Sequence, residues 1–154
     1  MNHLPLHLID ASSSQAADVT VTGVATEPHV LRLPNDADLS GLDLHGVARI
    51  ELDFPKFTDG RAFSQAVLLR RRHRFQGHIR AGGDVRVDLL QQLSRCGFTS
   101  AVLPSTKEVA LGQQLLAGFS GFYQGDAQQS TPHFAALPTH PQVTPVANLT
   151  GASA

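Results

Sequence analysis

The sequence predicts an α/β fold, a single domain in which about three consecutive strand–helix units build a parallel sheet. Apolar or alternating runs recur roughly every 20 to 25 residues, and a stretch with apolar residues at helical spacing follows each run. The chain has 154 residues, of which 42% are hydrophobic, so one domain can bury a core without disulfides. Right-handed crossovers should place the helices over an open or half-barrel-like sheet, because a complete eight-stranded barrel takes about 250 residues.

The first unit begins with a strand over residues 48–54, where apolar and charged residues alternate. Pro55 should end the strand, because proline has no amide hydrogen to donate to a sheet ladder. A helix is expected over residues 60–74, with Thr58 or Asp59 capping its first amides and a run of arginines at its C-terminal end. The loop between this strand and this helix holds the densest group of polar side chains in the sequence.

The second unit is expected to have a brief strand over residues 77–81 and a turn at Gly82 and Gly83. Asp84 should cap the helix that follows, because a carboxylate at this position can accept hydrogen bonds from the first helical amides. Gly97 should end this helix, since glycine is common just after a helix C-terminus.

The third unit is predicted from a strand over residues 98–103 and the strand-breaking Pro104. A helix should open at Ser105, because Glu108 follows it by three residues, which is the spacing of a capping box. Apolar residues at helical spacing supply its buried side until Ser120 and a glycine end the helix.

Outside these units the sequence is less regular. Residues 1–28 form a poorly defined N-terminal segment, in which only 18–24 alternates as a strand does. The α/β domain should span residues 29–123 and begin with a short alternating strand over 29–34. Residues 124–154 are rich in Pro, Thr, Ala and Gln and poor in large apolar residues, so we expect a disordered tail.

Composition and motifs disfavour several classes of function. The formal net charge is -1, so a nucleic acid or an anionic membrane is not an expected partner, and the arginines at 70–74 are better explained as a solvated helix end. The single cysteine, Cys96, allows no internal disulfide and no iron–sulfur cluster, and we expect it to be a buried packing thiol. The histidines show no metal-binding spacing, and no nicotinamide or flavin fingerprint is present, which leaves the cofactor unknown. Without a signal-peptide or membrane-spanning pattern, we expect a cytoplasmic protein.

A candidate site follows from the topology, because loops after parallel strands gather at the carboxyl edge of the sheet. This edge should bring together the loops 56–61, 80–84 and 104–106. Cations and helix N-terminal amides at this edge could bind an anion such as sulfite, phosphate or a carboxylate. For each residue taken alone, helix capping or ion pairing is an alternative role. The residues expected to bind an anion or a partner are Lys56, Thr58, Asp59, Arg61, Ser64, Gln65, Arg80, Asp84 and Asp88.

Two stretches, FPKFTDGRAFSQAVLL over residues 54–69 and RAGGDVRVDLLQQLSRCGF over 80–98, resemble a bacterial family of unknown biochemical function. Members of that family are often encoded beside assimilatory sulfite reductase, and some are labelled oxidoreductases of sulfite reduction. The resemblance covers residues 31–123, with two departures: Ala62 stands where the family has a glycine, and Gly82 stands where it usually has a valine. The resemblance implies a role in sulfur assimilation.

Two functions of different classes remain open. The first is a non-catalytic accessory protein of assimilatory sulfite reduction, which binds an anion or the sulfite reductase itself through the charged loops. The alternative is a small enzyme, an oxidoreductase of sulfite reduction, that uses Lys56, Asp59 or Asp84 as acid–base groups with a cofactor borrowed from a partner. Either function is compatible with a homo-oligomer in which a second chain completes a half-barrel-like sheet.

Overall fold

The structure is a computed structural model that describes residues 5–14, 29–118 and 122–136. Its elements in chain order are β1 (His7–Asp10), α1 (Ala11–Ser14), β2 (His29–Leu33), β3 (Val47–Phe54), α2 (Arg61–Arg71), β4 (His78–Gly83), the 3₁₀ helix η2 (Val87–Leu89), α3 (Leu90–Cys96), β5 (Ser100–Leu103), α4 (Thr106–Ala117) and α5 (His133–Ala136). From β3 to α4, strands and helices alternate along the chain, which is the order typical of an α/β fold.

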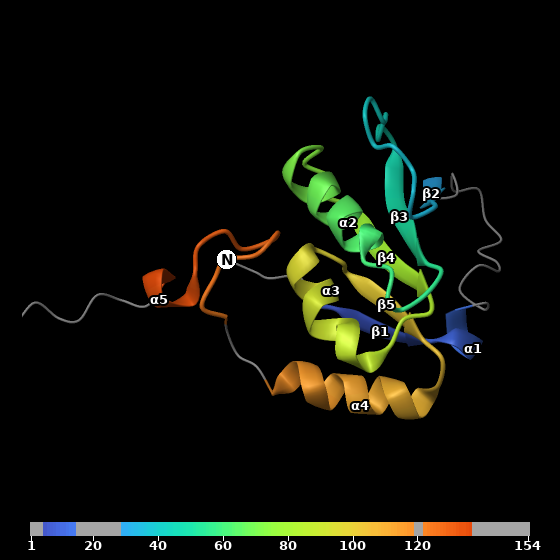
Figure 1. The fold of residues 1–154 in the computed structure, drawn as a ribbon, viewed down its shortest axis with the longest axis vertical. Helices are drawn as coiled ribbons and strands as arrows, with labels where there is room; N and C mark the ends of the chain where they lie inside the picture. The colour runs from blue at the N-terminus through green and yellow to red at the C-terminus, as the bar shows by residue number, and fades with distance from the viewer. Residues whose placement is uncertain (1–4, 15–28, 119–121, 137–154) are drawn as a thin grey trace, which may run out of the picture.

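The five strands form one parallel sheet in the order β1-β5-β4-β3-β2, and this sheet is open rather than closed into a barrel (Figure 1). The strands of the three predicted units, β3, β4 and β5, lie side by side in its centre. Strand β2 adds to one edge and β1 to the other. The prediction of a single α/β domain with a parallel sheet is therefore confirmed, in its open form.

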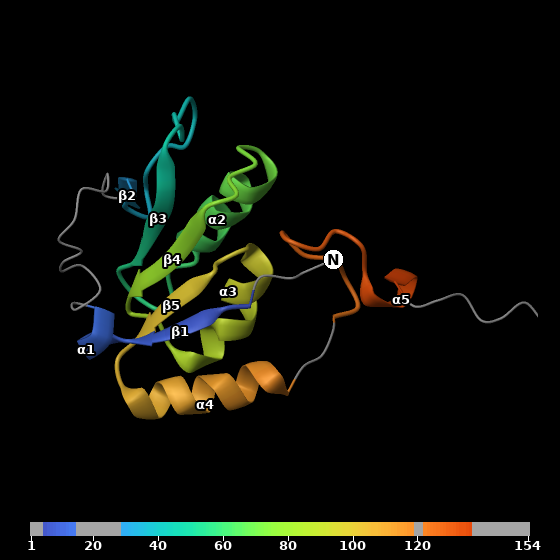
Figure 2. The same ribbon diagram turned by 180° about the vertical axis from the view of Figure 1, so that it is seen from behind.

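Helices α2, α3 and α4 lie on one face of the sheet, as the two opposite views show (Figure 1, Figure 2). Because β3, β4 and β5 follow one another in one direction across the sheet, right-handed crossovers bring their connecting helices to the same side. The largest side chains on the covered face of β3 and β4 are at most 1% exposed; these are Ile50, Leu52, Phe54 and Ile79. The hydrophobic core is the layer between this face and the three helices.

The first unit follows the prediction, except that its helix ends at Arg71 rather than at residue 74 and starts without the predicted side-chain cap. Strand β3 covers the expected residues and adds Val47. Helix α2 begins at Arg61, with Gly60 at the N-cap position and no side-chain cap on it. Asp59, the residue before this N-cap, still accepts a hydrogen bond from the helix: its Oδ1 accepts from the Arg61 amide at 3.2 Å. Thr58 is exposed and takes no part in this arrangement.

The second unit differs from the prediction in two ways. Gly82 and Gly83 are the last residues of β4 rather than a turn. Asp84 does not cap a helix, because α3 begins only at Leu90, after η2, and neither of these elements has a side-chain cap. The physical reason is that the neighbouring loop occupies the Asp84 carboxylate, whose Oδ2 accepts a hydrogen bond from the Phe57 amide at 3.1 Å.

The third unit forms with the predicted helix start. Strand β5 is followed by α4, and Ser105 is the N-cap residue of that helix. The Ser105 Oγ accepts a hydrogen bond from the Glu108 amide at 3.4 Å. The serine half of the predicted capping box is therefore present.

Strand β1 lies in the N-terminal segment that the sequence leaves undefined. It pairs in parallel with β5, so two segments more than 90 residues apart in the printed numbering share one edge of the sheet. Leu8 joins the core at 8% exposure. The segment 1–28 is thus more structured than expected at β1, whereas its strand-like run 18–24 lies outside the described residues.

Arg70 is not a solvated helix end, as was expected for the arginines of α2. Its Nε donates a hydrogen bond to Gly97 O at 2.9 Å, and its Nη1 donates to Phe75 O at 2.7 Å and to Gly77 O at 2.9 Å. Burial of the guanidinium lowers the pKa of Arg70 from its usual value. Arg70 therefore ties α2 to the segment before β4 and to Gly97, which ends α3 as predicted, with a φ of 97° that favours glycine.

The described part of the C-terminal segment contacts α3. The Ala127 amide donates a hydrogen bond to Arg95 O at 2.9 Å, and the Arg95 guanidinium lies 4.7 Å from the centroid of the Phe122 ring. The expected tail 124–154 is therefore in contact with the domain at Ala127, and residues 137–154 lie outside the described part of the chain.

Candidate functional site

The loops after β3 and β4 meet at the carboxyl edge of the sheet, as the topology predicts. Asp84 joins them, because its Oδ2 accepts the hydrogen bond from the Phe57 amide while its Oδ1 accepts one from Arg86 Nε at 3.3 Å. The Arg86 guanidinium also lies over the Phe57 ring, 4.4 Å from the ring centroid. The Asp84 carboxylate therefore holds two loops together.

Asp59 is the centre of a second cluster at the same edge. Its Oδ2 accepts hydrogen bonds from Asn35 Nδ2 and from Arg61 Nη2, both at 2.7 Å, and its Oδ1 accepts one from Arg61 Nε at 3.1 Å. The Arg61 side chain, followed by the Arg61 amide, is the main cause that lowers the pKa of Asp59 to about 2.

This cluster limits the chemistry of both residues. At neutral pH the Asp59 carboxylate is ionised, and a carboxylate with so low a pKa is a poor proton acceptor. The Arg61 guanidinium is held in a two-pronged ion pair with Asp59. The geometry thus favours the ion-pairing interpretation for Asp59 and Arg61 over acid–base catalysis.

The loop after β5 contacts a different partner. The Thr106 hydroxyl donates a hydrogen bond to Oδ2 of Asp10, the last residue of β1, and this bond is the largest cause that lowers the pKa of Asp10. Within the described ranges, no hydrogen bond joins residues 104–106 to the loops 56–61 or 83–86. The carboxyl edge therefore consists of two groups, one from β2, β3 and β4 and the other from β1 and β5.

The other predicted residues lie in separate places. Lys56 and Asp88 are exposed, in the loop after β3 and in η2, and neither side chain has a polar contact among the residues that the structure describes. Arg80 was expected at the carboxyl edge with the loop 80–84, but it lies within β4, inside the strand predicted over 77–81. Its Nη1 donates a hydrogen bond to Glu51 at 3.4 Å on the sheet face opposite the helices, so Arg80 is not part of the edge clusters.

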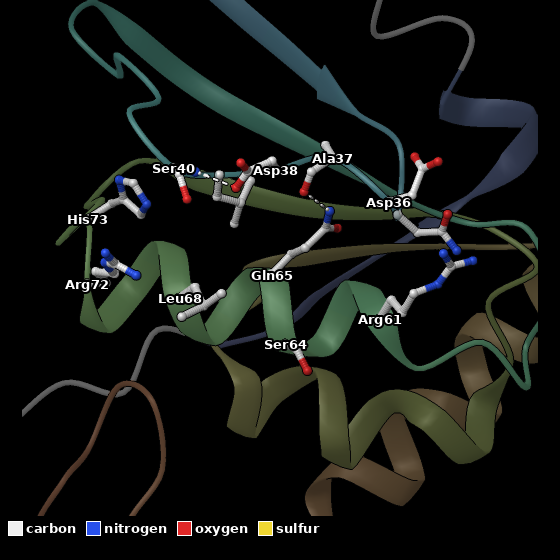
Figure 3. Close-up of a pocket in the computed structure, with 12 residues that line it drawn as sticks. Asp36, Ala37, Asp38, Ser40, Arg61, Ser64, Gln65, Leu68, Arg72 and His73 are labelled. Atoms are coloured by element: carbon white, nitrogen blue, oxygen red, sulfur yellow. Dashed lines mark hydrogen bonds between the residues drawn. The ribbon is translucent and has the colours of Figure 1, made fainter.

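Arg61, Ser64 and Gln65 line a groove of about 420 Å³ between α2 and residues 35–40 (Figure 3). Gln65 is only 6% exposed, and its Nε2 donates hydrogen bonds to Pro34 O at 2.9 Å and to a second carbonyl of this loop at 3.4 Å. Gln65 therefore fastens the loop to the helix. The Ser64 hydroxyl is directed away from the loop (Figure 3).

The other end of this groove is formed by residues that were not among the predicted site residues. Arg72 and His73 lie there, at the opposite end from Arg61 (Figure 3). A signal was available, because Arg61, Gln65, Leu68 and Arg72 recur at the i, i+4, i+7 and i+11 spacing of one helix face. Leu68 is 42% exposed within this stripe.

Three features that the sequence disfavoured can be examined in the structure: a reactive thiol, a metal site and a membrane-spanning helix. Cys96 is buried, and burial raises the pKa of its thiol, which agrees with the expected packing role. Among the described residues, no group of three or more His, Cys, Asp or Glu side chains is placed to hold a metal ion. None of the helices in these ranges has both the length and the apolar character needed to cross a membrane.

Comparison with known proteins identifies a family but no characterised relative. No curated protein matches the chain, and no solved structure matches it. The family of bacterial proteins of unknown function DUF934 matches residues 30–134, which is more than half of the chain. These residues include strands β3 to β5, helices α2 to α4 and both loops joined by Asp84. The chain therefore belongs to the bacterial family of unknown function DUF934.

Proposed function

We propose that this chain is a non-catalytic accessory protein of assimilatory sulfite reduction, which docks on the sulfite reductase through the loops after β3 and β4. The proposal rests on a contrast at this edge between carboxylates that hold the loops and side chains that are exposed to solvent. The carboxylates of Asp59 and Asp84 are engaged in holding the loops, whereas Lys56, Phe57 and Arg86 are exposed on the outside of them. This edge therefore suits the docking of a partner better than acid–base catalysis, because its carboxylates are already engaged.

The exposed group has the composition of a protein contact. Phe57 is 39% exposed, the Arg86 side chain is 55% exposed, and the two are stacked. Aromatic and arginine side chains are enriched among the residues that contribute most of the binding energy at protein interfaces. Because these two side chains are already stacked, less conformational entropy is lost when a partner binds. Lys56 is exposed and precedes Phe57 in the chain, and its positive charge can steer an acidic partner.

The pathway assignment in this proposal is supported by the resemblance to proteins encoded beside sulfite reductase. Its test is a deletion strain grown with sulfate, sulfite, sulfide or cysteine as the sole sulfur source. We expect the strain to fail on sulfate and sulfite and to grow on sulfide and cysteine, because sulfide bypasses the reductase. Normal growth of the deletion strain on sulfite would refute the assignment to sulfite reduction.

The docking surface is tested by direct binding of the purified chain to the purified sulfite reductase of the same bacterium, measured by calorimetry. We expect Lys56→Glu with Arg86→Glu to weaken binding at least tenfold, since charge reversal at a contact opposes association. Lys107→Glu is the matched control, because Lys107 is also exposed but belongs to α4. Equal affinity of the double variant and the control would refute this surface.

A further inference from the structure

The groove between α2 and residues 35–40 carries opposite charges on its two walls. Asp36 and Asp38 are exposed on the loop, and Arg61 and Arg72 are exposed on the helix (Figure 3). Asp36 acts electrostatically on Arg61, and Arg72 acts on Asp38, so each end of the groove pairs a carboxylate with a guanidinium. The groove is therefore suited to a ligand that carries charge itself.

The two ends differ in whether the guanidinium is already engaged. Arg61 is held by Asp59 in a two-pronged ion pair. Among the described residues, no hydrogen bond or ion pair involves the Arg72 side chain. The pKa of Asp38 is lowered mainly by hydrogen bonds from the Ser40 amide and hydroxyl, and the charge of Arg72 lowers it further. Asp38 and Arg72 thus lie across the groove from each other without a direct bond.

Gln65 adds a hydrogen-bond acceptor that lacks a donor. The residue is 6% exposed, and its Nε2 donates to the carbonyls of Pro34 and Ala37. These two bonds fix the orientation of the amide, because a carbonyl oxygen turned to the same position could donate to neither acceptor. The Gln65 Oε1 is buried and has no partner among the described residues. Since buried polar atoms are nearly always hydrogen-bonded, a ligand with an N–H group in this groove would satisfy Oε1.

An apolar surface lies between these polar groups. Gln65, Leu68 and Arg72 follow one another at the i, i+3 and i+7 positions of α2, which places them along one face of the helix. Leu68 lines the groove and is 42% exposed (Figure 3). An acceptor, an apolar side chain and a cation therefore follow in this order along one wall, and the Asp38 carboxylate belongs to the other.

We propose that this groove binds a free α-amino acid with an apolar side chain. The ligand carboxylate pairs with Arg72, because a guanidinium can hold a carboxylate through two parallel hydrogen bonds. The ligand ammonium, which has three N–H donors, bonds to Asp38 and to Gln65 Oε1. The ligand side chain packs on Leu68.

A zwitterion matches the groove better than a residue inside a peptide chain, because such a residue has neither charge and would leave Asp38 and Arg72 unmatched. The volume of about 420 Å³ lies within the range of small-molecule sites. The inference does not rest on the docking surface of the proposed function, since Lys56, Phe57 and Arg86 do not line this groove.

Titration of the isotope-labelled full chain with L-leucine, followed by NMR, tests the proposal. A groove buries less of a ligand than a closed cavity does, so we expect a Kd of about 0.1 to 10 mM and a titration that runs to about 50 mM. The amide signals of residues 35–40 and 64–73 should shift. Isocaproate, which lacks the ammonium, and isoamylamine, which lacks the carboxylate, should each bind at least tenfold more weakly. Equal binding of either analogue, or unchanged signals in these segments with leucine, would overturn the proposal.

Matched variants locate the binding site. Arg72→Gln should weaken leucine binding at least tenfold, whereas Arg71→Gln should leave it unchanged, because Arg71 is an exposed neighbour that does not line the groove. Asp38→Asn should weaken binding likewise, and Asp43→Asn should not. Asp38 and Asp43 each accept a hydrogen bond from the amide two residues later, so these two changes perturb the fold alike. Equal affinities within either pair of folded variants, as checked by circular dichroism, would overturn the proposal.

Discussion

Replacing Arg70 offers the most direct test of how this fold is held together. The Arg70 guanidinium donates to the carbonyls of Gly97, Phe75 and Gly77, which belong to two segments separated by the whole of β4 and α3. Arg70→Met keeps the length and the apolar stem of the side chain but removes all three hydrogen bonds. The three carbonyls would then lose their donor at a partly buried position.

The expected cost follows from these contacts. A hydrogen bond to a charged group contributes about 1.5 to 3 kcal/mol, so three of them set an upper bound of roughly 4.5 to 9 kcal/mol. The lowered pKa of Arg70 shows that burial opposes its charge, and bonds to one group are not additive. We therefore expect Arg70→Met to lower the free energy of unfolding by about 3 kcal/mol. Arg70→Lys should lose about 2 kcal/mol, because an ammonium group cannot reach both segments at once.

Urea unfolding followed by circular dichroism measures these losses. Arg72→Met is the matched control, since Arg72 is an exposed arginine at the end of the same helix, and it should change the free energy by no more than about 0.5 kcal/mol. If Arg70→Met costs less than about 1 kcal/mol, the hydrogen bonds merely offset desolvation of the guanidinium, and the reasoning fails.

Three further predictions concern single contacts. The pKa of Asp59 in the folded chain is about 2, below its usual value, because Arg61 pairs with it. The stability that this carboxylate adds is therefore fully present above about pH 4 and is lost as pH falls through 2, so the gap in unfolding free energy between wild type and Asp59→Asn should narrow over this range. A gap as wide at pH 2 as at neutral pH would contradict the ion pair. Gly97→Ala should cost more than about 1 kcal/mol in thermal unfolding, because φ is 97° and the new Cβ would lie 2.6 Å from Arg70 Cγ; a neutral effect would contradict this close approach. Ser105→Ala should cost about 0.5 to 1 kcal/mol in urea unfolding, whereas Ser105→Asp, which keeps an acceptor, should cost less; equal losses would exclude a capping role.

Local sequence patterns were sufficient wherever a structure depends on neighbours in the chain. The alternation in 48–54 predicts β3 because one face of that strand meets the core, and the spacing of Ser105 and Glu108 predicts the start of α4 because the cap bond joins residues three apart. Gly97 is predictable for the same reason, since a left-handed residue ends a helix locally. These features predict the α/β class and its three strand–helix units.

The candidate site was less predictable, because its polar groups choose partners that are distant in sequence. Asp84 has the pattern of a helix cap, yet the amide of Phe57, 27 residues away, takes its carboxylate. Gln65 has the position of a solvent-facing helical residue, yet the loop that begins at Pro34 buries it. A side chain with several donors or acceptors can form several alternative hydrogen bonds, and the packing of the loops decides which of them forms.

Strand β1 is another feature that depends on contacts between distant parts of the chain. Four residues near the N-terminus have too little pattern to predict a strand, and they become one because the edge of β5 offers unpaired backbone groups to them. By itself, the sequence determined the class of the fold, its three central units and the loops that could meet. Only the tertiary structure decided the edges of the sheet and the pairing of Asp59 with Arg61 and Asn35, because each depends on contacts between segments that no local pattern links.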